Sequence, residues 1–279
     1  MEIHNGDVTL NVEVDGPESA PPLVLLHGIT STHRTWTWLL PDLVADWRVH
    51  RLDFRGHGRS DRTPDGYDHG GYVSDAAALC AAAGSPCVVV GHSLGGGTAA
   101  ALAQRHPELV RAAVLEDPPL LVRPQMEGNS LLDAFRLMRE SVPRFQAEGV
   151  DAATLADILA AAPSSTGPTF AELLHRDAID AMAEGLLELD ASVLDPVLEG
   201  TVRFLYDAAS GVPVPTLLVT ADPASPDAVC GTAEATRLVA TSPDARLEVV
   251  TGSGHLVHDG LAGRATFRDL VLDFLAAHR

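Results

Sequence analysis

The amino-acid sequence predicts an α/β protein: a doubly wound, mostly parallel sheet that carries a helical insertion. Two observations lead to this fold class. Short, wholly apolar runs alternate with helical stretches, which is the pattern of strands buried between two layers of helices. One interval, from residue 118 to about residue 215, has helical spacing and no convincing strand. We therefore predict a core made of residues 1–117 and 213–279 and a helical insertion over residues 118–212.

The predicted strands differ in how they are covered. The first, Val8–Val14, alternates apolar and polar residues, as an exposed antiparallel strand does. The later ones are apolar on both faces, as parallel strands are when helices cover both sides of the sheet. They are Leu23–Leu26, Val49–Leu52, Cys87–Val90, Ala112–Leu115, Thr216–Thr220 and Leu247–Val250.

Helical stretches fill the intervals between these strands, and this alternation is what a doubly wound sheet requires. In the predicted core they are Thr35–Leu43, Tyr72–Ala83, Leu94–Arg105, Ala228–Val239 and Ala265–Ala277. In the insertion they are Leu131–Glu140, Thr154–Ala161 and Phe170–Leu194, separated by clusters of Pro, Gly and Ser.

Composition restricts the function. The 279 residues include 38 acidic and 19 basic side chains, the latter all arginine, so the net charge is −19. The absence of lysine excludes an internal aldimine with pyridoxal phosphate, a Schiff-base aldolase and a P-loop lysine. Binding to nucleic acid or to an anionic membrane needs basic patches, which this acidic chain does not favour. We expect a small-molecule partner, and the sequence predicts no particular oligomeric state.

The cysteines and the N-terminus indicate the compartment. Cys80, Cys87 and Cys230 form no metal-like cluster and are predicted to be buried thiols in a reducing environment. The N-terminus lacks the basic and apolar regions of a secretory signal, and no apolar run approaches the length of a membrane span. Together these features predict a cytoplasmic protein.

The predicted chemistry centres on Ser93. The segment Gly91-His92-Ser93-Leu94-Gly95 follows a buried strand and precedes a helix of small residues. A serine on such a sharp strand-to-helix turn has a strained backbone, and glycines two positions away on either side avoid clashes. The helix that starts near Leu94 points free N–H groups at the serine, where they favour a developing negative charge. Ser93 is therefore the predicted nucleophile.

Two further segments complete the predicted site. His27 and Gly28 directly follow a buried strand, and this turn is predicted to aim the backbone N–H of Ile29 at the same space as that of Leu94. Two such donors make an oxyanion hole. His255 lies on a loop just past the last predicted strand, from which it can reach the serine as a general base.

These motifs resemble those of α/β-hydrolase-fold enzymes. The resemblance rests on His27-Gly28, Asp53–Ser60, Gly91–Gly96 and Gly254-His255, which occur in the family's order on both sides of the insertion. The combination is specific for the fold and only weakly specific for the substrate. It implies that residues 118–212 form a cap over the active site and that Asp53–Ser60 has a structural role.

The acid of the triad has two candidates, because the family supplies it after the sixth or the seventh strand. Asp117 falls at the sixth-strand position, counted without gaps from Ser93. After the seventh strand the usual Gly-x-x-Asp pattern is displaced: Ala224 stands at the acid's position, and Asp222 comes two residues early. We predict Asp117, with Asp222 as the alternate acid. Glu116 ranks third, because it points to the opposite face if the strand continues that far.

A serine at position 93 favours acyl transfer to water. Relatives that cleave haloalkanes or epoxides carry aspartate there, so the resemblance argues against both activities. In the predicted mechanism Ser93 attacks a carbonyl carbon, His255 takes its proton and the acid orients His255. This chemistry needs no cofactor and no metal, and the spacing of the histidines matches no ligand set.

The substrate is predicted from the apolar character of the insertion. Phe135 and Met138, together with Trp36 and His92 from the core, are the candidates for lining an apolar pocket; the alternative is that the apolar residues of the insertion only hold its helices together. Since basic residues are few, a neutral carboxylic ester or lactone is the predicted substrate. Two alternatives stay open. One is C–C bond hydrolysis, or biosynthetic acyl transfer or cyclisation, on the same triad; the other is a non-catalytic ligand-binding protein of the same fold.

Overall fold

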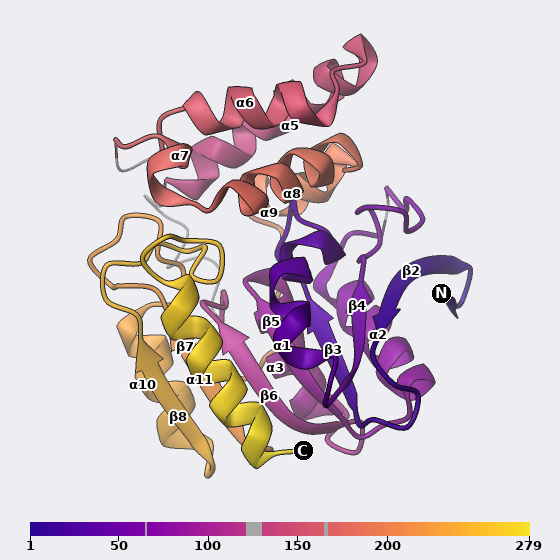
Figure 1. Cartoon of the computed structure of the whole chain (residues 1–279). Coiled ribbons are helices and arrows are strands. Elements are labelled where there is room, and N and C mark those ends of the chain that lie inside the picture. The colour runs from indigo at the N-terminus through magenta and orange to yellow at the C-terminus, as the bar shows by residue number, and fades with distance from the viewer. Residues whose placement is uncertain (65, 121–129, 165–166) are drawn as a thin grey trace.

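The computed structural model describes residues 1–64, 66–120, 130–164 and 167–279 (Figure 1). Its centre is a sheet of eight strands in the order β1-β2-β4-β3-β5-β6-β7-β8. Strand β2 pairs antiparallel with β1 and β4, and the other neighbouring strands are parallel, which confirms the predicted fold class. The strands are β1 (Glu2–Asn5), β2 (Val8–Asp15), β3 (Pro22–Leu26), β4 (Arg48–Leu52), β5 (Cys87–His92), β6 (Val110–Glu116), β7 (Thr216–Thr220) and β8 (Ala245–Val249).

Helices cover both faces of this sheet. Successive side chains of β5 point to opposite faces, so Val88 and Val90 join one hydrophobic core while Cys87 and Val89 join the other. All six residues of β5 are buried, as expected for a strand with helices on both sides. The core-covering helices are η1 (His33–Leu39), α1 (Leu40–Leu43), α2 (His69–Ala83), α3 (Leu94–Arg105), α10 (Thr232–Thr241) and α11 (Arg264–Ala277).

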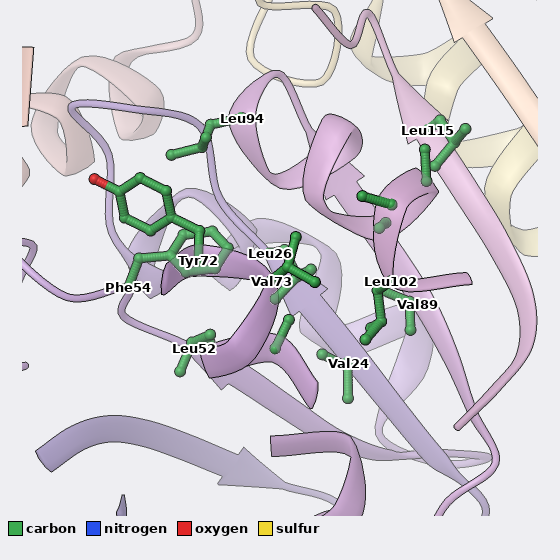
Figure 2. Close-up of a cluster of buried hydrophobic side chains, with 14 of the residues drawn as sticks. Val24, Leu26, Leu52, Phe54, Tyr72, Val73, Val89, Leu94, Leu102 and Leu115 are labelled. Carbon is green, nitrogen blue, oxygen red and sulfur yellow. The ribbon is translucent and has the colours of Figure 1, made fainter. Parts of the chain in front are cut away.

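The two cores divide the helices between the faces. Helices α2, α3 and α10 pack on one face, where Val24, Leu26, Val89 and Leu102 meet (Figure 2). Helices η1, α1 and α11 pack on the other face, around the fully buried Trp36. A parallel sheet closed on both sides leaves only its strand ends accessible, and the site described below lies at the carboxyl ends.

The insertion leaves the sheet after β6 and returns at β7, which are neighbours in the sheet. Its helices lie over the carboxyl ends of the strands (Figure 1). Within the described part of residues 118–212, Pro163 and Thr169 form an isolated bridge, and no strand joins the sheet. The helices are α5 (Leu131–Glu148), α6 (Ala152–Ala161), α7 (Phe170–Leu173), α8 (Arg176–Leu187), η2 (Ala191–Leu194) and α9 (Asp195–Leu198).

Helix α10 begins later than predicted, and the reason lies in the site. The sequence predicts a helix over Ala228–Val239, whereas α10 starts at Thr232. The backbone N–H groups of Val229 and Cys230 donate to the carboxylate of Asp117 instead of belonging to a helix. A tertiary hydrogen bond therefore overrides the local helical pattern.

Two other predictions can be scored directly. Cys80, Cys87 and Cys230 are all buried and free, which confirms the prediction of buried thiols. Among the described residues, no helix is both long and apolar enough to cross a bilayer.

Candidate active site

Ser93 sits at the sharp turn between β5 and α3. Its φ and ψ angles are 51° and −116°, a strained conformation for a residue with a side chain. The neighbouring glycines make this turn possible. A Cβ atom on Gly91 would lie 2.2 Å from the carbonyl oxygen of Gly95, and one on Gly95 would lie 2.4 Å from that of Leu26. The turn presents Ser93 at the floor of a cavity.

Two backbone N–H groups flank Ser93. The turn after β3 approaches the serine so closely that a Cβ on Gly28 would lie 3.2 Å from the Ser93 Cβ. Ile29 follows in this turn and Leu94 is the first residue of α3, and both line the same cavity as Ser93. Neither N–H has a hydrogen-bond partner within the described ranges. Both are therefore available to a ligand.

His27 fixes the turn that carries Ile29, a role that the sequence alone did not assign. Its Nδ1–H donates to the Gly28 carbonyl (2.7 Å), and its Nε2 accepts from the backbone N–H of Phe54 (3.1 Å). Complete burial, helped by the nearby His57, lowers the pKa of His27 to about 3. A neutral ring with one donor and one acceptor fits these two partners.

Asp117 and His255 form a buried pair across 138 positions of sequence. The Nδ1–H of His255 donates to Asp117 Oδ2 at 2.6 Å. The same carboxylate accepts backbone N–H groups of Val229 (2.9 Å), Cys230 (3.1 Å) and Ala221 (3.4 Å). Asp117 is fully buried, so these donors replace the water that a carboxylate would otherwise need. These bonds hold the carboxylate at the Nδ1 edge of the His255 ring.

Asp222, the alternate acid, lies elsewhere. Its two carboxylate oxygens accept the backbone N–H groups of Gly252 (2.7 Å) and Ala224 (2.9 Å). These two bonds, the Gly252 one first, lower the pKa of Asp222. Asp222 therefore braces the loop before His255 without contacting its ring, and the structure brings Asp117, not Asp222, to the histidine.

His92 supports His255 from below, which corrects its predicted place in the pocket lining. Its Nε2–H donates to the backbone carbonyl of His255 (3.2 Å), and the two rings lie 4.8 Å apart. Burial, followed by repulsion from His255 and His258, lowers the pKa of His92 well below its usual value. The ring is therefore neutral. Side chains alternate between the two faces along β5, and His92 is buried within the protein and does not line the cavity.

The cavity above Ser93 is almost entirely apolar. Together with the open solvent at its mouth, the space enclosed by its walls is about 590 Å³. It is lined by Ile29, Tyr67, His69, Tyr72, Ser93, Leu94, Pro119, Leu131, Phe135, Val193, Val197, Val202, Phe204 and Val229. The insertion thus supplies one wall and the core supplies the floor.

Three predicted lining residues fall in different places. Phe135 lines the cavity as predicted. Met138, one helical turn further along α5, packs half-buried against the hydrophobic core and is not among the lining residues. Trp36 lies on the far face of the sheet, where its ring packs against His258 and Phe267, so its prediction was wrong. The apolar character of Trp36 serves the core rather than the pocket.

The sequence missed the polar members of the lining, because they belong to the loop before α2 and to α2 itself. Burial lowers the pKa of His69 to about 4, so its ring is neutral, and its Nδ1 accepts the backbone N–H of Leu205 (3.0 Å). Tyr67 donates its hydroxyl to Asp190 (2.7 Å). The Tyr72 hydroxyl, by contrast, has no partner within the described part of the chain.

A metal site was not predicted, and one group of side chains bears on this point. Among the described residues, His92, Glu116 and His258 bring possible ligand atoms within 4.8 Å of one another. Their polar atoms already bond to each other or to the loop of His255. These hydrogen bonds hold the three side chains together.

Comparison with known proteins agrees with this fold and site. Over 271 residues the chain is 27% identical to the sn-1-specific diacylglycerol lipase ABHD11 of Mus musculus, covering 94% of this chain and 83% of the lipase. It is 37% identical over 113 residues to the 2-(acetamidomethylene)succinate hydrolase of Mesorhizobium japonicum. That second match spans 40% of each protein, so it covers less than half of the relative.

A solved structure and a family model extend the match to nearly the whole chain. The crystal structure of E-2-(acetamidomethylene)succinate hydrolase has a TM-score of 0.76 and 25% identity, and the match covers 99% of this chain and 98% of that one. The family model of the alpha/beta hydrolase fold matches residues 21–260, which include every residue of the site described above. The chain therefore belongs to the α/β hydrolase fold family.

Proposed function

We propose that this protein is a serine hydrolase that cleaves a neutral carboxylic ester or lactone through an acyl-enzyme. The observation that carries the proposal is the 2.6 Å pair of Asp117 and His255 on a loop beside the Ser93 turn. Nucleophile, base, acid and two free N–H donors are what acyl transfer requires. Ser93, Ile29 and Leu94 line one cavity, and His92, the neighbour of Ser93, holds the backbone carbonyl of His255 (3.2 Å).

The reaction would run in two steps. Ser93 Oγ attacks the carbonyl carbon while its proton moves to Nε2 of His255, and the N–H groups of Ile29 and Leu94 stabilise the oxyanion. The alcohol leaves with that proton. Water, deprotonated by His255, then attacks the acyl-enzyme, and collapse of the second oxyanion returns the proton to Ser93 and releases the acid. Asp117 holds the Nδ1–H of His255 and stabilises its charged form.

The lining supports a neutral acyl group. The described cavity wall contains no arginine, and its three ionisable rings, Tyr67, His69 and Tyr72, are neutral near pH 7. The insertion, residues 118–212, adds fifteen acidic and six basic residues in sequence, a balance of −9. Both features disfavour an anionic substrate. The lipase ABHD11 is, by its name, also an ester hydrolase.

The test is ester hydrolysis by Ser93→Ala. We expect the wild type to hydrolyse short p-nitrophenyl esters and to react with a fluorophosphonate at Ser93. The alanine variant should lose at least about 10³-fold in kcat, because the nucleophile is gone while the binding cavity persists. Intact turnover in Ser93→Ala would contradict the proposal. Cleavage of a vinylogous diketone in preference to every ester would favour the C–C hydrolase alternative.

Charge selectivity gives a second measurement. For esters of equal chain length we expect kcat/KM to be highest for neutral acyl groups and lowest for acyl groups that end in a carboxylate. The difference should shrink as salt is added, because screening weakens the repulsion. A preference for the carboxylate-ended ester at low salt would contradict a neutral substrate.

A further inference from the structure

A second carboxylate–histidine pair lies directly behind Asp117 and His255. Glu116 precedes Asp117 in the chain, and His258 follows His255 by three positions. The carboxylate of Glu116 accepts the Nδ1–H of His258, with distances of 2.8 and 2.9 Å to its two oxygens, and also the His258 backbone N–H at 2.8 Å. Strand β6 thus ends in two acids that hold two histidines of one loop.

The two acids face opposite sides of the sheet. Side chains alternate along a strand, so Asp117 reaches the cavity side while Glu116 reaches the far side, where Trp36 stacks on the His258 ring at 4.4 Å. Glu116 and His258 are both fully buried, with exposures of 0%. Neither can touch a substrate in the cavity.

Both ring nitrogens of His258 have hydrogen-bond partners. The Nδ1–H donates to Glu116, and Nε2 lies 2.7 Å from the Thr35 hydroxyl, which also contacts Asp259 Oδ2 (3.2 Å). Burial opposes a charge on the ring, but the nearby Asp259 and Glu116 outweigh it and raise the pKa of His258. A fully buried ring that is bonded at both nitrogens cannot take a proton from a group in the cavity, so its role differs from that of His255.

His92 connects the two histidines. Its ring lies 4.8 Å from the His255 ring and 4.9 Å from the His258 ring, and its Nε2–H donates to the backbone carbonyl of His255. The loop is thus gripped at residue 258 through side chain and backbone, and at residue 255 through ring and carbonyl. Since all of these contacts are buried, the loop has little freedom to rotate.

We propose that Glu116 and His258 are a positioning pair that locks the loop of His255 so that its ring stays aligned between Asp117 and Ser93. The inference rests on the proposed serine hydrolase function. It predicts that loosening the pair impairs proton transfer, which depends on fractions of an ångström, and leaves substrate binding in the separate cavity intact.

The test compares Glu116→Gln and Glu116→Asp with the wild type. Glutamine keeps the size and removes the charge, and aspartate keeps the charge but withdraws it from His258 by one methylene. For both we expect kcat on a p-nitrophenyl ester to fall about 10–100-fold, with KM changed less than about twofold. The low-field proton resonance of the His255–Asp117 hydrogen bond should broaden or exchange faster.

Asp75→Asn is the matched control. Asp75 is likewise a fully buried carboxylate, and it pairs with Arg55 (2.7 Å) away from the His255 loop. We expect it to lower the melting temperature and to leave kcat and the low-field resonance of the folded protein as they are. Equal effects of Asp75→Asn and Glu116→Gln on kcat would overturn the proposal, as would full activity of both Glu116 variants.

A third readout separates this inference from the proposed function. The rate of Ser93 labelling by a fluorophosphonate depends on His255 alignment but needs no knowledge of the substrate. If the wild type is labelled but hydrolyses no ester, the ester proposal fails, and slower labelling of the Glu116 variants still supports the positioning pair. Labelling at the wild-type rate in both variants refutes it.

Discussion

Asp117 shows how one residue's role depends on groups far away in the chain. Its carboxylate receives N–H donors from residues 221, 229 and 230 and the ring of His255. Its own φ of 38° is uncommon for a residue with a side chain, and the surrounding bonds hold it there. Four donors satisfy the hydrogen-bonding capacity of the buried carboxylate in place of water.

Exchanging the two candidate acids tests this role. Asp117→Asn should lower kcat on the order of 10⁴-fold, because the amide stabilises the wrong tautomer of His255 and cannot offset its positive charge. Asp222→Asn should change kcat less than about tenfold, because Asp222 holds only backbone N–H groups. Steady-state kinetics with a p-nitrophenyl ester measure both. A larger loss in Asp222→Asn would assign the acid to the other strand.

Individual site residues were predictable to different degrees. Ser93 and His255 stand in local patterns of glycines that indicate backbone shape, so the sequence alone was enough to predict both. Choosing between Asp117 and Asp222 required knowing which loop N–H groups converge on which carboxylate. Trp36 was misplaced because an apolar side chain fits a core and a pocket equally well, and only the sheet face on which it lies distinguishes the two.

The turn between β5 and α3 is tightly constrained by backbone atoms on both sides. Carbonyl oxygens lie 2.2 Å and 2.4 Å from where Cβ atoms on its two flanking glycines would be, so strand, helix and the end of β3 are in backbone contact. Such contacts leave no room for relaxation by side-chain movement. The turn holds the strained Ser93 because its neighbours cannot yield.

Gly91→Ala tests that constraint. We expect the variant to lose several kcal/mol of unfolding free energy or to fail to fold, because its Cβ would meet backbone atoms. Gly185→Ala is the matched control: in α8 its Cβ would have ordinary contacts of 3.4 Å or more, and alanine favours helix. Urea unfolding of both variants makes the comparison. Equal stability of the two would show that the turn can relax.

At the level of elements, alternation of strand and helix was predictable and their ends were less so. Strands β3, β5 and β7 were recognised because they are largely apolar on both faces. The short edge strand β1, with an exposed side and four residues, lacks that signal. The predicted stretch Phe170–Leu194 is divided among α7, α8 and η2, because the backbone N–H of His175 bonds to Asp259 of the His255 loop.

Across the whole molecule, several buried histidines are held neutral. Burial is the largest cause in each case, and it lowers the pKa of His27 to about 3 and those of His57 and His69 to about 4. In the unfolded chain a histidine titrates near 6.5. Below that pH the unfolded state binds protons that the folded state refuses, so these residues make stability fall as the pH falls from about 6.5 towards 4.

His57→Gln measures this effect. Between pH 7.5 and 5.5 the wild type should lose roughly 1 kcal/mol more unfolding free energy than the variant, because the unfolded variant has one histidine fewer to bind a proton. Urea titrations at the two pH values give the difference. His4→Gln, which removes an exposed histidine, should leave the wild-type loss unchanged. Identical pH dependence in wild type and His57→Gln would refute the linkage.

The insertion begins just after Glu116 and ends just before Thr216, on two parallel neighbouring strands in which Thr216 lies opposite Ala113 and Glu116 opposite Val219. Its two ends are therefore separated by one strand spacing across the sheet and three residues along it, roughly 11 Å in all. Closing a gap of this size depends only weakly on the length of the chain between the ends. Ser93, Asp117 and His255 belong to the strands and loops of the sheet, while Phe135, Val193 and Val197 of the insertion line the cavity. An engineer can therefore exchange the insertion as a unit and change the cavity wall while those three residues stay in place.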